Sequence, residues 1–274
     1  MTSGNWGRIP GGLKYVDVGM IGDSKPAPLP APAPAPAPTP AAAVSSFVWG
    51  VNKNDQIYYR EGVKGSWKLI GGALKQVSVS DDGQHVWGVN KQNNIWYRNG
   101  VNGSWQRING ALVHVSVNAD GTHVWGTNAG SKIWYRTGVK GPWKNIAGGL
   151  NMVSVSGNGQ HIVGCHSSGS IWYRKGVNAA SWTKLSGALK HVDVNNDGSQ
   201  FVGVNKNDDI YYRNGVKASW VKIDGKLKQI STSADGKEIW GVSSEDHIYW
   251  RPGMTSGNWG RIPGGLKYVD VGMK

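Results

Sequence analysis

The sequence repeats itself six times, and this repetition limits the folds open to the chain more than any other feature. Each copy spans about 38 residues and contains an aromatic residue followed by Arg, with a Trp shortly afterwards. The Arg positions are Arg60, Arg98, Arg136, Arg174, Arg213 and Arg251. The Trp positions are Trp67, Trp105, Trp143, Trp182, Trp220 and Trp259. A repeat of this length is typical of solenoids, propellers and arrays, so one supersecondary unit is predicted to build the whole domain.

One copy, residues 112–148, reads as four short strands. Val115 and Val117 alternate with polar residues, and Asp120-Gly121 follows as a hairpin signal. The segments THVWGT, KIWYR and PWKNIAG come next, each bounded by Gly, Asn or Asp and too short for a helix. Four antiparallel strands per repeat predict an all-β chain folded as a six-bladed β-propeller, because ring closure protects the blade edges.

The ends of the chain indicate how the ring closes. The propeller is predicted over residues 47–274, and at residue 47 the chain enters the second strand of a blade. A lone first strand remains at residues 266–271, so the C-terminal strand is predicted to complete the first blade. Without this strand the first blade would expose an unpaired edge.

Residues 1–20 are identical to residues 254–273, although a six-bladed ring has room for one copy only. A Pro/Ala-rich linker at 21–46 separates the early copy from the propeller and is predicted to be a semi-rigid spacer. The late copy has the shorter tether and is predicted to fill the ring. The early copy would then be displaced, or swapped into a neighbouring molecule to make a homo-oligomer.

Composition and charge narrow the functional classes. The net charge of +13 permits acidic partners such as anionic glycolipid, but the Lys and Arg are spread over every repeat, and no nucleic-acid partner is expected. The single Cys165 excludes an intramolecular disulfide. Neither a secretory signal nor an apolar run of about 18 residues is visible, so we expect no membrane span. The expected location is the cytoplasm, or outside after export without a classical signal peptide.

The titratable residues indicate no enzyme. His85, His123 and His161 share one repeat position, and His114 and His191 share another. Residues related by blade rotation are predicted to lie a blade width apart, too far to share a metal ion. We therefore expect neither catalysis nor a metal or cofactor.

The recurring aromatic and polar residues are the candidate binding groups. Four second strands carry Trp where two others carry Val163 and Val202, which is the pattern expected of a binding site that can be lost. The candidate sugar-binding residues are Trp49, Trp87, Trp125 and Trp240, with Asn52, Asn90, Asn128 and Asn205, and Arg60, Arg98, Arg136 and Arg213. Indole faces pack on pyranose C–H groups, while amide and guanidinium groups bind hydroxyls. The alternative is that the Asn form turns and the Arg close inter-blade hydrogen bonds or cation–π stacks.

The pattern W-x-x-I-x-G-G-L-x-x-V-S-V, then G-x-x-V-W-G-V-N and I-W-Y-R, recurs across residues 47–274 and stands with small changes at Trp105 to Arg136. It closely resembles the tectonin repeat. The resemblance implies a six-bladed propeller lectin similar to the tectonins, the fish-egg lectins and tachylectin-like proteins. It implies innate defence through microbial glycans: O-methylated sugars, N-acetylglucosamine or lipopolysaccharide. Cys165 and His166 depart from the pattern, as do Val163 and Val202.

Three functions compete at this point. The first is a non-catalytic, multivalent lectin with repeated inter-blade sites. The second is a protein-interaction scaffold, as other propellers are. The third is a binder of anionic glycolipid or lipopolysaccharide through the basic surface, which predicts strong salt dependence.

Overall fold

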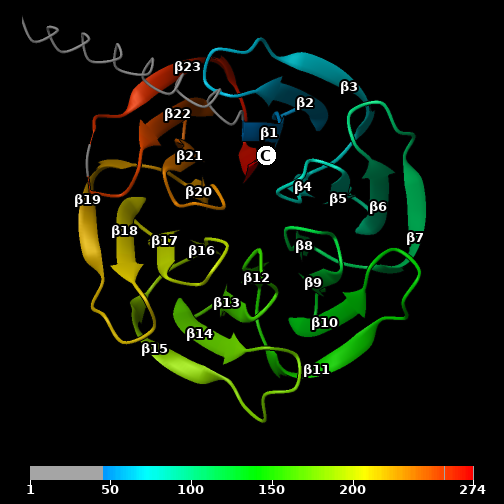
Figure 1. Ribbon diagram of the computed structural model, residues 1–274, viewed down its shortest axis with the longest axis vertical. Coiled ribbons are helices and arrows are strands. Elements are labelled where there is room, and N and C mark those ends of the chain that lie inside the picture. Colours follow the sequence, from blue (N-terminus) through cyan, green and yellow to red (C-terminus); the bar gives the residue numbers. More distant parts are fainter. Residues whose placement is uncertain (1–45, 256, 274) are drawn as a thin grey trace, which may run out of the picture. The chain divides into compact units, whose positions relative to one another are not determined.

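The computed structural model describes residues 46–255 and 257–273, and these form an all-β ring of six blades (Figure 1). Each blade is a sheet of four antiparallel strands that run in order from the centre of the ring to its rim. The predicted six-bladed β-propeller is confirmed. Blade 1 contains β24 and β1–β3, and blades 2 to 6 contain β4–β7, β8–β11, β12–β15, β16–β19 and β20–β23.

Four strand positions recur in every blade. The innermost strands are β24 (Tyr268–Met273), β4 (Gln76–Val79), β8 (His114–Val117), β12 (Met152–Val155), β16 (His191–Val194) and β20 (Gln229–Thr232). The second strands are β1 (Ser46–Val51), β5 (His85–Val89), β9 (His123–Thr127), β13 (His161–Cys165), β17 (Gln200–Val204) and β21 (Glu238–Val242). The third strands are β2 (Gln56–Glu61), β6 (Asn94–Asn99), β10 (Lys132–Thr137), β14 (Ser170–Lys175), β18 (Asp209–Asn214) and β22 (His247–Pro252). The outer strands are β3 (Lys68–Ala73), β7 (Gln106–Ala111), β11 (Lys144–Gly149), β15 (Thr183–Ala188), β19 (Val221–Lys226) and β23 (Gly260–Gly265).

The inner hairpins form as their turn residues predict. In the turn between β8 and β9, Gly121 has a φ of 74°, a left-handed conformation that disfavours other residues. The Oδ1 atom of Asp120 accepts a hydrogen bond from the Thr122 backbone N–H at 3.0 Å, and so holds the turn. Asp120 therefore serves as a turn residue.

The hydrophobic core is divided among the interfaces between neighbouring blades. One cluster joins Trp49 and Ile57 of blade 1 to Val77 and Val86 of blade 2, and equivalent clusters recur around the ring. Each blade thus buries its apolar surface on its neighbours, as repeat proteins do.

Hydrogen bonds around the centre also join the blades. In the innermost strands, the Ser78 hydroxyl accepts a hydrogen bond from the Val117 N–H of the next blade at 3.2 Å. Between blade 1 and blade 2, the carboxylate of Asp270 in β24 accepts a hydrogen bond from the Val79 N–H at 2.7 Å.

The C-terminal strand closes the ring as predicted. β24 pairs with β1 in antiparallel register from Ser46 opposite Met273 to Val51 opposite Tyr268. The early copy at residues 1–20 and the predicted linker at 21–46, apart from Ser46 in β1, lie outside the described residues, so displacement or swapping of the early copy stays a prediction. Within the described residues, no helix has the length and apolar character to cross a membrane.

Candidate functional site

The four second-strand Trp side chains are buried in the inter-blade core. Trp49, Trp87, Trp125 and Trp240 are each 0% exposed. A ring that is sealed from solvent cannot stack on a sugar, so the prediction that these indoles contact sugar is wrong in this conformation. Three of them, Trp49, Trp87 and Trp125, pack against third-strand Tyr residues, as in the pair Trp125 and Tyr135, whose ring centroids lie 5.1 Å apart.

The repeated Arg side chains are also interior. In blade 3, Arg136 donates from Nε to the Gly138 carbonyl at 2.9 Å and from Nη2 to the Val139 carbonyl. Its guanidinium lies 5.0 Å from the centroid of Trp143, which is cation–π distance. Burial lowers the pKa of this guanidinium. The same arrangement recurs at the other predicted positions, Arg60, Arg98 and Arg213. These Arg residues therefore hold the turn and the following Trp, which is the alternative role that the sequence left open.

The predicted Asn residues form turns, and two of them also reach a cleft. The Oδ1 of Asn128 accepts hydrogen bonds from the Gly130 N–H at 3.1 Å and the Lys132 N–H at 2.9 Å. Equivalent bonds form at Asn52, Asn90 and Asn205. The amide nitrogens of Asn52 and Asn205 donate to Gln56 and Asp209, whereas Asn90 and Asn128 line clefts between blades.

The partly exposed aromatic groups belong to a different set, the Trp residues that precede the outer strands. Each of these indoles donates from Nε1 across the interface to a backbone carbonyl of the preceding blade. For Trp143 the acceptor is the Asn109 carbonyl, at 2.9 Å. A Cβ atom on Gly110 would lie 3.3 Å from this Nε1 atom, so glycine lets the indole lie close to the neighbouring strand. In the sequence these Trp stand out only as repeat markers, although the Gly that recurs near the end of each outer strand, such as Gly110, is compatible with such a close approach.

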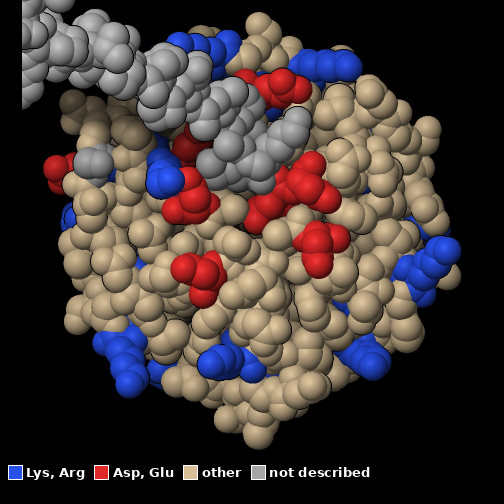
Figure 2. All heavy atoms as spheres, in the orientation of Figure 1, with Lys and Arg blue, Asp and Glu red and all other residues tan. Residues whose placement is uncertain are grey.

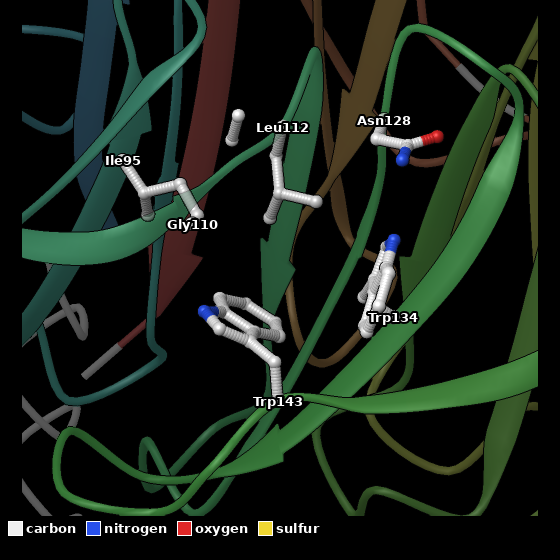
Figure 3. Close-up of a pocket in the computed structure, with 7 residues that line it drawn as sticks. Ile95, Gly110, Leu112, Asn128, Trp134 and Trp143 are labelled. Atoms are coloured by element: carbon white, nitrogen blue, oxygen red, sulfur yellow. The ribbon is translucent and has the colours of Figure 1, made fainter.

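The cleft between blades 2 and 3 shows how the site is built (Figure 3). Trp134 of β10 and Trp143 lie at two sides of the same space, with Leu112 between them and Asn128 above Trp134. The cavity measures about 250 Å³, and its other lining residues are Ile95, Gly110 and Ala111. Two half-buried indoles, an apolar floor and one amide can hold a small, neutral, amphipathic ligand.

Three further clefts repeat this plan with different residues. The cleft between blades 1 and 2 has Trp96, Trp105 and Asn90 and measures about 260 Å³. The cleft between blades 5 and 6 measures about 300 Å³ and adds the charged Lys226 and Glu245. The cleft between blades 3 and 4 is the largest of the four, at about 660 Å³.

The centre of the ring brings together His residues that were predicted to lie apart. The Tyr268 hydroxyl is within hydrogen-bond distance of His114 Nε2, at 3.1 Å, and of His191 Nε2, at 3.3 Å. The two imidazole centroids are 6.1 Å apart. The predicted separation of a blade width is wrong for this pair, because innermost strands converge on the axis. Burial lowers the pKa of His114 to about 4 and that of His191 to about 3.

One end of the centre is acidic. Figure 2 shows acidic side chains gathered around the middle of this face and basic ones toward its rim. The carboxyl groups of Asp81, Asp193 and Asp270 line a central cavity of about 30 Å³, and burial raises the pKa of all three, that of Asp81 to about 7. This space has room for a water molecule but not for a sugar. Among the described residues, no group of three His, Cys, Asp or Glu side chains is placed to bind a metal ion.

Comparisons with known proteins agree with this architecture. The Tectonin domain family matches residues 40–181 and 177–274. Among curated proteins, no sequence matches this chain. One similar solved structure is the β-propeller domain of Myceliophteria thermophila Cps50 (Swd1), with a TM-score of 0.53 and 9% identity over 72% of this chain and 71% of that one. That likeness concerns the fold alone. Because the family match covers most of the sequence, the chain belongs to the Tectonin domain family.

Proposed function

We propose that this protein is a non-catalytic, multivalent lectin that binds glycans in the clefts between its blades. The observation that carries the proposal is the repeated pairing of two half-buried indoles with one amide, as at Trp134, Trp143 and Asn128. The C–H faces of a pyranose pack on indole rings, and an amide beside them can form hydrogen bonds with a hydroxyl or acetamido group. The family and the fold fit a lectin or an interaction propeller, and the neutral aromatic clefts favour the lectin.

The chemistry of the clefts also favours a class of sugar. In the clefts between blades 1 and 2 and between blades 2 and 3, the lining residues are apolar except for one Asn each. An O-methyl group or an acetamido methyl would add apolar contact in such a site. O-methylated sugars and N-acetylglucosamine are therefore the ligands that we propose, as parts of microbial surface glycans or lipopolysaccharide.

Repetition would make weak sites effective. A shallow cavity of about 250 Å³ buries little ligand surface, so each site alone is expected to bind weakly. Several such clefts on one ring can engage a repeating glycan surface together, which raises the overall affinity without new contacts. Recognition of microbial surfaces in innate defence is the use that we propose for this avidity.

A glycan array probed at low and at high salt tests the proposal. We expect binding to a narrow set of glycans, nearly unchanged by salt, and much weaker in the double variant Trp105→Ala, Trp143→Ala, which removes two of the clefts and with them much of the avidity. Binding that collapses at high salt would instead indicate a polyanion binder acting through the basic surface. Absence of binding to every glycan, methylated ones included, would overturn the proposal. So would a stoichiometric protein partner that free sugar does not displace.

A further inference from the structure

The cleft between blades 3 and 4, here called cleft 3/4, is the exception among the inter-blade clefts. Its volume is about 660 Å³, against about 250 Å³ for the cleft between blades 2 and 3. Cleft 3/4 retains the aromatic platform, because Trp172 and Trp182 line it and Trp182 Nε1 still donates to the Ala147 carbonyl at 2.8 Å. It is an enlarged site rather than a collapsed one.

Two local differences in the sequence accompany the larger volume. The connection between β14 and β15, GVNAASW at residues 176–182, is one residue longer than GVKGPW at 138–143, and its Ala180 and Ser181 join the lining. Ser170 and Gly149 occupy the positions that Lys132 and Ala111 hold one blade earlier, and both small residues line the cleft.

Two further observations show the same opening. Ile146 in β11 is half-buried, whereas the equivalent Ile70 and Ile108 are only 4% and 5% exposed. The guanidinium of Arg174 lies 5.8 Å from the Trp182 centroid, which is longer than the 5.0 Å of the corresponding pair in blade 3.

The added space is polar on one side. His166 replaces the turn-forming Asn, and its Nδ1 accepts a hydrogen bond from the Ser168 N–H at 3.2 Å. In the neutral imidazole the proton must then be on Nε2, which makes His166 a donor. The Ser168 hydroxyl lies 2.9 Å from Nδ1 and 3.0 Å from the Ser170 hydroxyl, so a short row of hydroxyl groups extends beside the indoles.

We propose that cleft 3/4 binds two linked sugar residues, whereas the cleft between blades 2 and 3 binds one. One sugar would pack on Trp172 and Trp182, and the next would lie along Ser168 and Ser170, where hydroxyl groups meet hydroxyl groups. The inference rests on the proposed function, since it takes the ligand to be a glycan. Cleft 3/4 would then select glycans by chain length, whereas the other clefts of the ring would bind single sugars.

The test follows the indole N–H signals in ¹H–¹⁵N spectra of the full chain, with Trp182 and Trp143 assigned from Trp→Phe variants. The probes are N-acetylglucosamine and its β1,4-linked disaccharide, or the same pair of whichever sugar the array selects. We expect Trp182 to respond to the disaccharide at a concentration about tenfold lower than to the monosaccharide. Trp143 should respond to both at concentrations that agree within about threefold.

Deletion of Ala180 provides the matched variant, because it gives the connection the length of GVKASW at residues 215–220 in blade 5. The variant should lose the disaccharide preference at Trp182 and keep the Trp143 response, which also reports that the ring is folded. Ser170→Lys, which restores the residue type of blade 3, should act in the same direction if the deletion does not fold. Equal responses of Trp182 to both probes, or none while Trp143 responds, would overturn the inference and leave the lectin proposal standing. Silence at every cleft Trp would overturn the lectin proposal itself.

Discussion

Two of the sets of Trp residues in this propeller can be compared directly, and their burial is the opposite of what their recurrence indicates. The second-strand set, represented by Trp87, is missing from two blades, yet its members are fully buried. The set that precedes the outer strands, represented by Trp143, is present in all six blades, yet its members are partly exposed. Four of them, Trp105, Trp143, Trp182 and Trp259, line the clefts described above. A Trp that recurs in every blade therefore has a structural role, here the hydrogen bond that its indole N–H donates across the blade interface. Its recurrence does not mean that it is buried.

The two blades without a second-strand Trp show why that residue can be lost. Val163 belongs to a core cluster that also contains Phe201, which is fully buried. Val202 belongs to a cluster that contains Met254. Other large side chains fill the space, so the interface keeps its packing without an indole.

Replacement of a buried Trp should have the largest effect. Trp87→Ala removes a fully buried indole and should lower the free energy of unfolding by about 3–5 kcal/mol. Urea denaturation followed by circular dichroism measures the loss, with Trp87→Phe as the milder control. A Trp87→Ala variant of unchanged stability that had lost glycan binding would reverse our assignment of the two sets.

The free energy of unfolding should depend on pH through the buried groups at the centre of the ring, whereas glycan binding in the clefts should not depend on pH. Asp81 has a folded pKa of about 7, raised by burial and by Asp193, Asp82 and Asp235, so the folded state binds its proton more tightly than the unfolded state does. This carboxyl therefore makes the free energy of unfolding fall as pH rises from about 4 to about 7. His114 acts oppositely, since its lowered pKa costs stability as pH falls below about 6.5.

The variant Asp81→Asn isolates the first of these contributions. It should match the wild type near pH 4 and be more stable by about 1–3 kcal/mol at pH 8. Thermal unfolding at several pH values provides the measurement. Glycan affinity in the clefts should stay constant across the same range. If stability depended on pH identically in both proteins, Asp81 would make no contribution to that dependence.

Loss of a cleft Trp should affect binding more than stability. Trp143→Ala removes a half-buried indole, its hydrogen bond to Asn109 and its stack on Arg136, which together contribute about 1–2 kcal/mol to folding. One binding site should disappear, so the stoichiometry measured by calorimetry should fall by one. An unchanged stoichiometry with the glycan that the array selects would contradict the cleft assignment.

The smallest effect is expected at the Asn residues. Asn128→Ala removes two hydrogen bonds to loop N–H groups and the amide at the cleft, and should cost about 0.5–1.5 kcal/mol of stability with a few-fold loss of affinity. Asn52→Ala is the control, because the amide nitrogen of Asn52 already donates to Gln56. Equal losses of affinity in both variants would show that the amide at the cleft makes no contact with ligand.

The sequence predicted the fold almost completely, but it did not predict which aromatic side chains are buried and which line the clefts. Strands and turns follow from local patterns that recur around the ring, such as the Asp-Gly or Asn-Gly turn that five blades contain, so each repeat supports the others. Which face of a blade meets solvent depends on how far neighbouring sheets lie apart, and no local pattern encodes that spacing. Trp87 was consequently placed in the site and Trp143 left out. The convergence of His114 and His191 was missed for the same reason, since strand separation changes with distance from the axis.

A crystal structure of the protein with the sugar that the array selects would test the central claim most directly. We expect the pyranose ring to lie between Trp134 and Trp143, within reach of Asn128, with Trp87 and Trp125 unmoved and dry. Sugar bound in the acidic centre or on the outer strands, with the inter-blade clefts empty, would contradict the account.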